Sequence, residues 1–418
     1  MAVPPTLPSE TDVLVVGGGI IGTATAFFLS RRSDRSIALV DKENVASGAT
    51  GDSSAILRHT YGDRDLYSRM AWAGREFYQR FEAETGYPLD APSQPLVQWG
   101  GPAGGHFESP MSSYETLRSL DYPVTRYEAE ELPDRFPLFE FKEGFEYAIS
   151  DDAAAYSDGT DAANGFLKAA QDNGVEVVTG VTVESIDVED GSVVGAETDD
   201  GYVACSDVVL AAGSWNHKIA ATADVEIPIT PGREQVLLLK PPAELSDEEV
   251  KSIMTTGWGS PRPDGVWWYF RADFGGTIYM GTHARNDPVD PDRYSRQPDM
   301  QRKVEAFEIL DEFAPALADS EVMGEFCGVY ANTPDQGFII DEVDHDGLYA
   351  LVGAGHAFKH APVIGQLAAD LVVDGESERF DLEHFTVDRF DDRSPDQGFP
   401  ETVSLADLHG TTSAPETK

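Results

Sequence analysis

Short, uninterrupted apolar runs alternate along this chain with segments in which apolar residues recur every three or four positions. The first run is Val13–Val16, and a glycine-rich turn, an apolar helical segment and a second run ending at Asp41 follow it. Apolar runs of this length between turn residues are typical of buried strands. Residues 11–41 therefore predict one βαβ unit, and the spacing of apolar residues predicts helices at 65–82, 161–172 and 361–374.

The same pattern predicts a second α/β stretch from about residue 157 and a strand-rich stretch after it. Strands are predicted at residues 175–178, 208–212, 235–239, 266–270, 277–280, 338–340 and 348–352, with a hairpin at 181–198. Residues 91–149 are rich in proline, glycine and aromatic residues and predict irregular structure. The polar tail, residues 393–418, predicts disorder.

The α/β stretches are interrupted twice, by residues 91–149 and by the strand-rich residues 226–330, which indicates two interleaved domains with a ligand between them. The expected fold is α/β, with a Rossmann-like cofactor-binding domain interleaved with a mainly antiparallel β-sheet substrate domain. The cofactor domain is assigned residues 1–90, 150–225 and 331–392. The substrate domain is assigned residues 91–149 and 226–330.

Composition narrows the setting of the protein. At 418 residues the chain is long enough for two or three domains. No apolar run reaches the length of about 18 residues that a membrane span needs. Residues 1–10 lack the basic and apolar regions of a signal peptide, and the two cysteines, Cys205 and Cys327, show no metal-ligand spacing. We therefore expect a cytoplasmic protein without a metal site.

The charge is unusually negative, with 74 acidic against 30 basic residues and a net charge of −44. The acids are spread along the whole chain, which is typical of a solvated acidic surface that high salt screens. We expect a protein adapted to high salt, of the kind found in an acidic, halophilic proteome. Nucleic acid is disfavoured as a partner because phosphate binding needs Lys and Arg.

The turn after the first strand carries the clearest chemistry. Gly17, Gly19 and Gly22 have the G-x-G-x-x-G spacing, and Asp41 stands 19 residues after Gly22. These glycines permit a tight turn, close approach of a pyrophosphate and close helix–strand packing, and the acid binds ribose hydroxyls. The pattern predicts a dinucleotide site and leaves NAD and FAD open.

Four separated blocks resemble the D-amino-acid oxidase superfamily of FAD-dependent oxidoreductases. They are the glycine turn, the block Gly48–Gly62, the block Val209–Trp215, and Thr333–Asp335 together with Gly353–Lys359. The chain is most similar to the subgroup of sarcosine oxidase, glycine oxidase and related amine or amino-acid dehydrogenases, over about residues 11–390. The resemblance implies that FAD is the cofactor and that a C–N bond is oxidised.

The resemblance also implies roles for particular residues. Besides the three glycines and Asp41, it implies cofactor contacts for Ile20, Ile21, Lys42, Gly48, Ala49, Thr50, Ser53, Ser54, Val183, Ala212, Gly213, Trp215, Gly353, Gly355, His356, Phe358 and Lys359. Arg58 matches an arginine that binds the substrate carboxylate, and Lys359 matches the second cation on that carboxylate. The alternatives are a surface salt bridge for Arg58 and a solvated lysine for Lys359.

Aromatic residues complete the expected substrate pocket. Tyr269 and Tyr330 match pocket tyrosines of the family, and His283 matches a histidine that faces the substrate amine or the flavin. His59 and Tyr61 are expected in the same pocket. Each tyrosine could equally be a core aromatic, and His283 could be an ordinary surface histidine.

Two positions depart from the oxidases of the subgroup. Where sarcosine oxidase has a cysteine bound covalently to flavin, this chain aligns Gly328, and Cys327 is one residue away. A one-residue slip on a strand reverses the side-chain direction, so non-covalent FAD is expected. Where those oxidases use a lysine to speed reaction with O₂, this chain aligns Tyr279, which favours a dehydrogenase with another acceptor.

The expected activity is oxidation of a small amino acid or N-methyl amino acid by hydride transfer to FAD. The expected partners are a small anionic amine substrate and either O₂ or an electron carrier. One alternative is an FAD-dependent 2-hydroxy acid dehydrogenase. Another is the flavin subunit of a larger amine dehydrogenase complex, which would make the protein part of a hetero-oligomer.

Overall fold

The computed structural model describes residues 6–102, 109–251, 254–258, 266–283 and 287–390. One of its two large sheets has six strands in the order β18-β19-β12-β1-β2-β8. The strands are parallel except for β18, which is antiparallel to β19. Their bounds are β1 Val13–Val16, β2 Ile37–Asp41, β8 Glu176–Thr179, β12 Asp207–Leu210, β18 Ile339–Glu342 and β19 Leu348–Val352.

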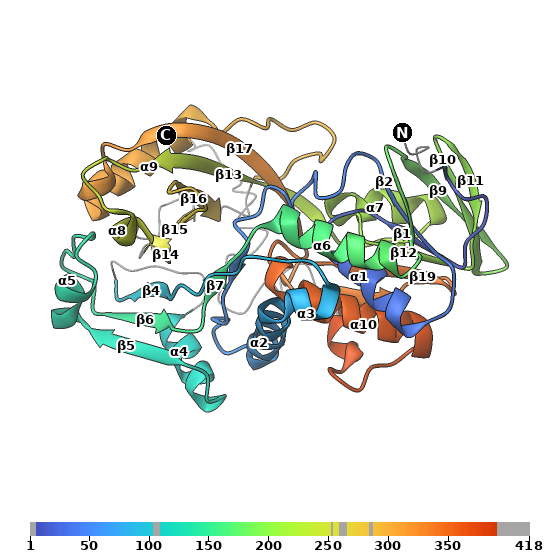
Figure 1. Ribbon diagram of the computed structural model, residues 1–418, viewed down its shortest axis with the longest axis horizontal. Coiled ribbons are helices and arrows are strands. Elements are labelled where there is room, and N and C mark those ends of the chain that lie inside the picture. Colours follow the sequence, from blue (N-terminus) through green and yellow to red (C-terminus); the bar gives the residue numbers. More distant parts are fainter. Residues whose placement is uncertain (1–5, 103–108, 252–253, 259–265, 284–286, 391–418) are drawn as a thin grey trace, which may run out of the picture.

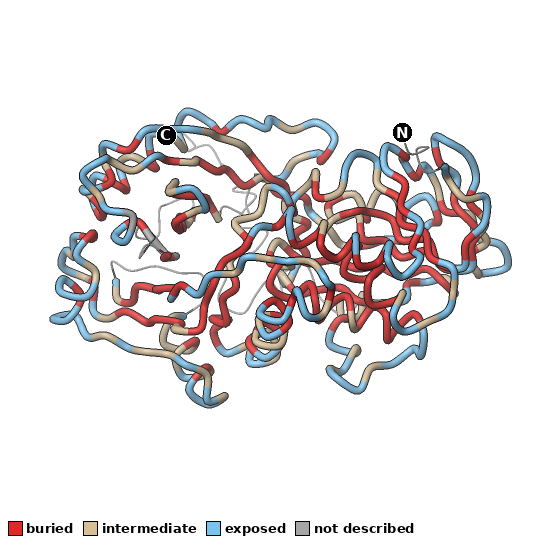
Figure 2. The backbone as a smooth tube through the Cα atoms, in the orientation of Figure 1, coloured by how far each residue is buried: buried red, intermediate tan, exposed pale blue. Residues whose placement is uncertain are grey.

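Both faces of this sheet are covered (Figure 1). Val13 and Val15 pack with helices α1 (Ile20–Arg32), α6 (Gly159–Asp172) and α10 (Ala361–Asp374). Leu14 and Val16 pack with a three-stranded sheet of β9 (Val183–Glu189), β10 (Ser192–Thr198) and β11 (Gly201–Ala204). Because both faces are buried, these strands are continuous apolar runs, and Figure 2 shows them as one of the densest red regions.

The second large sheet has eight strands in the order β17-β13-β16-β15-β14-β4-β6-β5. Neighbouring strands are antiparallel except for β14 and β4, which are parallel. Helix α9 (Met300–Phe313) packs against it. The strands are β4 Leu96–Gly100, β5 Val124–Glu128, β6 Tyr147–Asp151, β13 Thr230–Lys240, β14 Met254–Trp258, β15 Trp267–Ala272, β16 Ile278–His283 and β17 Glu321–Asn332.

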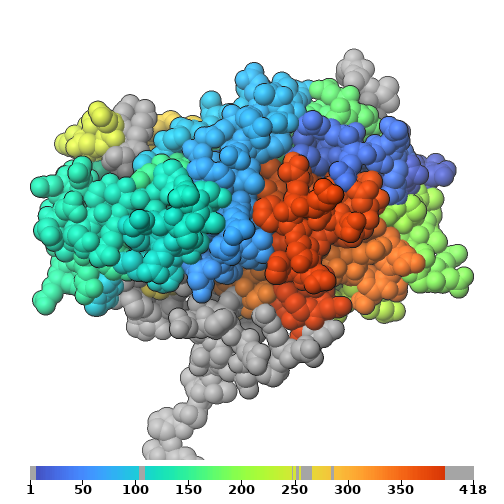
Figure 3. Space-filling model, turned by 90° about the horizontal axis from the view of Figure 1, so that it is seen from below, coloured from blue at the N-terminus to red at the C-terminus, as the bar shows by residue number. Residues whose placement is uncertain are grey.

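Shorter elements connect the two sheets. Strand β3 (Ile56–Leu57) pairs with β7 (Ala155–Tyr156), and α2 (Asp65–Gln79) follows β3. Seen from below, the blue segment around α2 lies between the teal segment of α4 and β5 and the orange C-terminal segment (Figure 3). The other helices are α3 Phe81–Thr85, α4 Pro110–Ser119, α5 Leu132–Arg135, α7 Asn216–Ala220, α8 Asp247–Lys251, η1 Ala129–Glu131, η2 Gly213–Trp215, η3 Ala221–Ala223, η4 Pro315–Leu317, η5 Phe358–His360, η6 Leu382–Phe385 and η7 Val387–Phe390.

Two expectations from the sequence were wrong. Residues 91–149 are not irregular, because they contribute β4, α4, β5 and the start of β6. The helix expected over 65–82 ends at Gln79, and a separate turn of helix, α3, follows. The expected disordered tail, 393–418, lies outside the described residues. The domain boundaries stay a prediction, although the strands of the two large sheets come from alternating stretches of the chain.

No described helix has the length and apolarity needed to cross a membrane.

Candidate active site

The glycine turn joins β1 to α1 by very close backbone packing. Gly17 has a φ of +111°, and a Cβ there would lie 2.6 Å from the Ala211 carbonyl oxygen. A Cβ at Gly22 would lie 1.9 Å from the Gly17 carbonyl oxygen. These contacts leave no room for a side chain, so the turn brings the start of α1 directly against the ends of β1 and β12.

The start of α1 is arranged to receive an anion. The first turn of the helix holds no acidic residue. Asp41 lies beside it at the end of β2, where its Oδ2 accepts from the Gly18 N–H at 2.7 Å and its Oδ1 accepts from the Glu43 N–H at 2.8 Å. Burial raises the pKa of Asp41, and these hydrogen bonds oppose that rise. A helix N-terminus beside an acid fits a phosphate next to a ribose.

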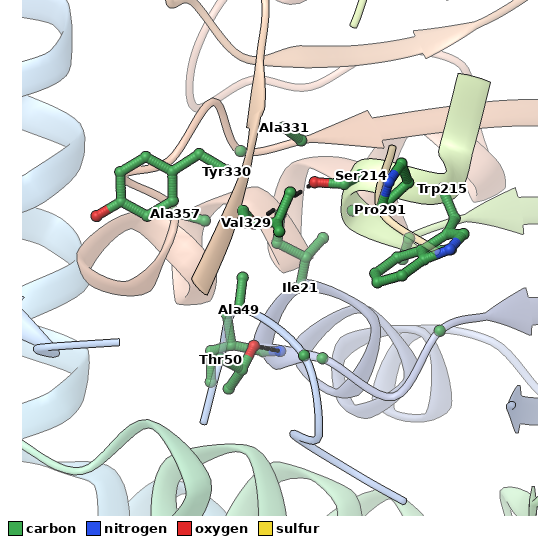
Figure 4. Close-up of a pocket in the computed structure, with 18 of the residues that line it drawn as sticks. Ile21, Ala49, Thr50, Ser214, Trp215, Pro291, Val329, Tyr330, Ala331 and Ala357 are labelled. Carbon is green, nitrogen blue, oxygen red and sulfur yellow. Dashed lines mark hydrogen bonds between the residues drawn. The ribbon is translucent and has the colours of Figure 1, made fainter. Parts of the chain in front are cut away.

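A cavity of about 640 Å³ runs from this turn to the eight-stranded sheet. Figure 4 shows Ala49 and Thr50 below it, Tyr330 and Val329 above it, and Trp215 and Pro291 at one end. The predicted residues that line it are Gly17, Gly19, Ile20, Ile21, Asp41, Lys42, Gly48, Ala49, Thr50, Ser53, Ser54, Arg58, Val183, Ala212, Gly213, Trp215, Tyr269, His283, Tyr330, Gly353, Gly355, His356, Phe358 and Lys359.

Four residues that the sequence associated with the site are not among the described residues lining the cavity. Gly22 packs the helix on the strand instead, as its Cβ contact shows. His59 and Tyr61 were expected in the pocket, but each is only 1% exposed and lies behind the wall. Tyr279 is also buried, and its hydroxyl donates to the Asp52 carbonyl oxygen at 2.7 Å.

The sequence did not indicate that residues 291–296 border the cavity, at the end where Trp215 lies. Asp292 in this segment accepts from Trp215 Nε1 at 2.6 Å and from Lys218 Nζ at 2.6 Å. Hydrogen bonds from Lys218 and Trp215 lower the pKa of Asp292 to about 2. Lys42 Nζ lies 3.7 Å from the centre of a Trp215 ring. No sequence motif marks the segment, because the Asp292 side chain binds Trp215 and Lys218, which are more than 70 residues away in the chain.

The inner end of the cavity holds two buried cations, Arg58 and Lys359, called the cation pair below. They are 8% and 6% exposed. The Arg58 guanidinium donates to the Thr60 carbonyl and stacks on the Tyr61 ring, 4.5 Å from its centre. Lys359 Nζ lies 6.0 Å from the centre of the same ring and donates to the His356 carbonyl at 3.4 Å. Two like charges in one buried place favour an anionic ligand.

Helix α2 contacts the segments that carry both cations. A Cβ at Gly74 would lie 1.9 Å from the Lys359 carbonyl oxygen, and the Tyr78 hydroxyl donates to the Phe358 carbonyl at 2.7 Å. Ser68 Oγ, on the same helix, donates at 2.8 Å to the carbonyl of His59, the residue that follows Arg58. One rigid helix therefore sets the position of both cation-bearing segments.

Aromatic side chains from the eight-stranded sheet also line the cavity. His283 lies between Tyr269 and Tyr330, with ring centres at 5.0 Å and 6.1 Å. Burial raises the pKa of the Tyr269 phenol, so this hydroxyl stays neutral at physiological pH. The arrangement supplies flat, uncharged walls and one imidazole that could accept a proton.

The position aligned with the flavin-bound cysteine is on β17. Cys327 is fully buried, burial raises the pKa of its thiol to about 12, and it is not among the described residues lining the cavity. A Cβ at Gly328 would lie 3.1 Å from Cβ of Asp52. A thiol this buried and this weakly acidic is a poor nucleophile toward a cofactor.

A sequence model of the FAD dependent oxidoreductase family matches residues 12–371, and the chain belongs to this family. Monomeric sarcosine oxidase of Bacillus sp. (strain NS-129) is 27% identical over 395 residues, covering 92% of this chain and 98% of that protein. Sarcosine oxidase subunit beta of Rhizobium meliloti (strain 1021) is 25% identical, covering 91% and 88%. L-proline dehydrogenase from P. horikoshii superposes with a TM-score of 0.78 at 22% identity, covering 92% and 99%.

The family confirms the resemblance, the α/β fold class and FAD as the cofactor. The cavity has room for FAD. Gly48 and Gly213 border open space, since a Cβ at either would meet nothing within 4 Å. The start of α1 could hold the pyrophosphate and Asp41 the ribose, which leaves the end near the cation pair for the flavin ring and a substrate.

Proposed function

We propose that this protein oxidises the C–N bond of a small amino acid or N-methyl amino acid. The cation pair carries the proposal, because two buried positive charges at the inner end of an FAD cavity match a carboxylate. Arg58 can bind a carboxylate with two parallel N–H groups, and Lys359 supplies a second, compact charge. The similarity to sarcosine oxidases supports an amino acid with a free or methylated amine.

The protein's own residues act mainly by positioning. Arg58 and Lys359 hold the carboxylate, and the walls of Tyr269, His283 and Tyr330 orient the reacting carbon. When bound, FAD would supply the redox chemistry, because it can accept a hydride, one proton with two electrons, from a substrate C–H bond. An amine that binds unprotonated needs no general base, and His283 or a water takes the proton of one that binds charged. Water then hydrolyses the released imine to an aldehyde or 2-oxo acid and an amine or ammonia.

Anaerobic bleaching of the flavin tests this proposal. Purified holoenzyme is mixed, without oxygen, with sarcosine, glycine, D- and L-amino acids, N-methyl amino acids and 2-hydroxy acids. Loss of the oxidised flavin absorbance with an amine substrate, and not with its 2-hydroxy analogue, is the expected result. Bleaching by 2-hydroxy acids alone would replace the proposal with a 2-hydroxy acid dehydrogenase, for which His283 is the base that alcohol oxidation requires.

We further propose that the electron acceptor is not O₂. Tyr279, at the position expected for a cation that speeds reaction with O₂, is neutral, and its hydroxyl is bound to the Asp52 carbonyl. A neutral phenol held behind the wall stabilises developing superoxide poorly. Air added to the bleached enzyme should restore the absorbance slowly, and an artificial acceptor should restore it quickly. Reoxidation by air at the rate of substrate turnover would identify an oxidase.

We propose that FAD is held without a covalent bond, because the Cys327 thiol is buried away from the cavity. Acid precipitation should leave a colourless pellet and a yellow supernatant. A yellow pellet would contradict this. The similarity to a sarcosine oxidase beta subunit supports a second possibility, a flavin subunit within a larger complex. Size-exclusion chromatography of native extract distinguishes it from an independent enzyme.

A further inference from the structure

A buried histidine next to Arg58 is hydrogen-bonded to a buried aspartate. His59 and Asp151 are each 1% exposed. His59 Nδ1 lies 3.1 Å from both carboxylate oxygens of Asp151, and its backbone N–H donates to Asp151 Oδ2 at 2.7 Å. Because a carboxylate only accepts, Nδ1 carries the ring proton. Asp151 therefore holds both the backbone and the side chain of the residue after Arg58.

We propose that His59 and Asp151 are positioning residues that set the Arg58 guanidinium for the substrate carboxylate. This inference rests on the proposed function of Arg58. Neither residue lines the cavity, so neither touches the substrate. They act through the backbone of residues 58–62, which carries Arg58 to the cavity wall.

Contacts within residues 58–62 hold the Arg58 guanidinium. Arg58 Nη1 lies 3.3 Å from Thr60 Oγ1, donates to the Thr60 carbonyl, and stacks on Tyr61, so its guanidinium is held by its own segment. At the far end, the Gly62 N–H donates to Ser113 Oγ at 2.9 Å. The orientation of the guanidinium therefore follows the orientation of the segment rather than a free rotation of the side chain.

His59 anchors the middle of this segment from two sides. Its N–H is bound by Asp151 on β6 of the eight-stranded sheet, and its carbonyl accepts from Ser68 Oγ on α2. Its Nε2 has no hydrogen-bond partner among the described residues, and the ring packs against Trp72 with centres 5.2 Å apart. The Asp151 carboxylate is thus the polar contact that fixes the ring. Losing it would free the residue next to Arg58 while leaving Ser68 in place.

The test compares neighbouring acids in the FAD-loaded enzyme. Asp151→Asn keeps the shape of the side chain but removes the charge and one acceptor. The matched control is Asp152→Asn, since Asp152 accepts from the Thr125 hydroxyl on β5 and the Ser150 hydroxyl on β6, each at 2.6 Å, rather than from residues 58–62. The probe is propionate, a carboxylate without an oxidisable amine, and its Kd is measured from the change in flavin absorbance.

Asp151→Asn should weaken propionate binding by about tenfold or more, because a small displacement of a binding group is costly. Asp152→Asn should leave the Kd unchanged. His59→Leu should weaken binding like Asp151→Asn, and His59→Asn should retain it, because an asparagine amide can donate to Asp151 from the place of Nδ1. Propionamide, which lacks the charge, should bind all variants alike. Equal propionate Kd values for Asp151→Asn and the native enzyme would overturn the proposal.

A double-mutant cycle separates positioning from a general structural effect. In the Arg58→Met background, Asp151→Asn should change the propionate Kd by less than about twofold, because the group it positions is gone. A tenfold effect in both backgrounds would show that Asp151 acts otherwise and would overturn the proposal. If Arg58→Met alone leaves the Kd unchanged, the carboxylate role of Arg58 fails. If Arg58→Met weakens binding and Asp151→Asn does not, only the positioning role fails.

Discussion

Lys359→Met tests the cation pair most directly, because methionine keeps much of the apolar stem and removes the charge. Lys359 is 6% exposed, so water screens its charge little. A charge-assisted hydrogen bond contributes about 1.5–3 kcal/mol. At about 1.4 kcal/mol per factor of ten, the Kd of a carboxylate should rise about 10- to 150-fold. The attraction of two charges about 4 Å apart, about 4 kcal/mol at an effective dielectric of 20, is the upper limit.

The same change should not destabilise the free protein. In the native enzyme, the Lys359 ammonium and the Arg58 guanidinium both lie near the Tyr61 ring, at 6.0 Å and 4.5 Å from its centre. Removing one of two neighbouring like charges relieves repulsion, so the thermal midpoint should stay level or rise while ligand binding weakens. If Lys359 had only a structural role, its loss would lower the thermal midpoint and the affinity for the ligand together.

The assay measures the Kd of propionate and of propionamide, together with kcat/KM for the best amino-acid substrate. Lys359→Met should reduce the preference for the carboxylate over the amide. The matched control is Lys240→Met, because Lys240 is an exposed lysine that pairs with Glu321 at 3.5 Å on the surface. An unchanged ratio of propionate to propionamide affinity in Lys359→Met would refute the assignment of Lys359 to the carboxylate.

Three further predictions follow from the same structure. Arg58→Ala should raise KM sharply and lower kcat as well, because the guanidinium both binds and orients the substrate; steady-state kinetics with an unchanged KM would remove Arg58 from the site. Burial raises the pKa of Asp52 to about 6 from its ordinary value of 3.8. Between these two pH values the folded protein keeps a proton on Asp52 that the unfolded chain has lost, so the free energy of unfolding falls as the pH rises from 4 to 6. Asp52→Asn should therefore raise the free energy of unfolding at pH 8, by at most about 3 kcal/mol, and have little effect at pH 4, as urea titrations at the two pH values would show. The charge of −44 predicts a higher melting temperature in molar KCl than in low salt, and equal or greater stability at low salt would contradict adaptation to high salt.

Much of the cofactor-binding fold could be predicted because its signals are local. Strands β1, β2, β12 and β19 are buried on both faces, so each is a continuous apolar run bounded by turn residues. Helices α6 and α10 end where glycine or asparagine follows the apolar pattern, and their bounds lie within two residues of those predicted.

Residues 91–149 escaped prediction because their strands depend on distant partners. Strand β4 pairs with β6 on one side and with β14, more than 150 residues later, on the other. Strand β5 is an edge strand with no buried residue, so it lacks the alternation that marks a half-buried strand. A proline-rich sequence with such strands resembles a loop when only neighbours in the chain are considered.

The sequence by itself determined the class of cofactor and the kinds of side chain available for the substrate. The glycine spacing, Asp41 and the separated family blocks depend on residue type and short distances along the chain, so they can be recognised without coordinates. Only the tertiary structure decided which residues face the cavity. Arg58 and Lys359 come from opposite ends of the chain, and packing against α2 brings them together. His59, adjacent to Arg58 in sequence, does not line the cavity, because Asp151 of the eight-stranded sheet binds its backbone and its ring.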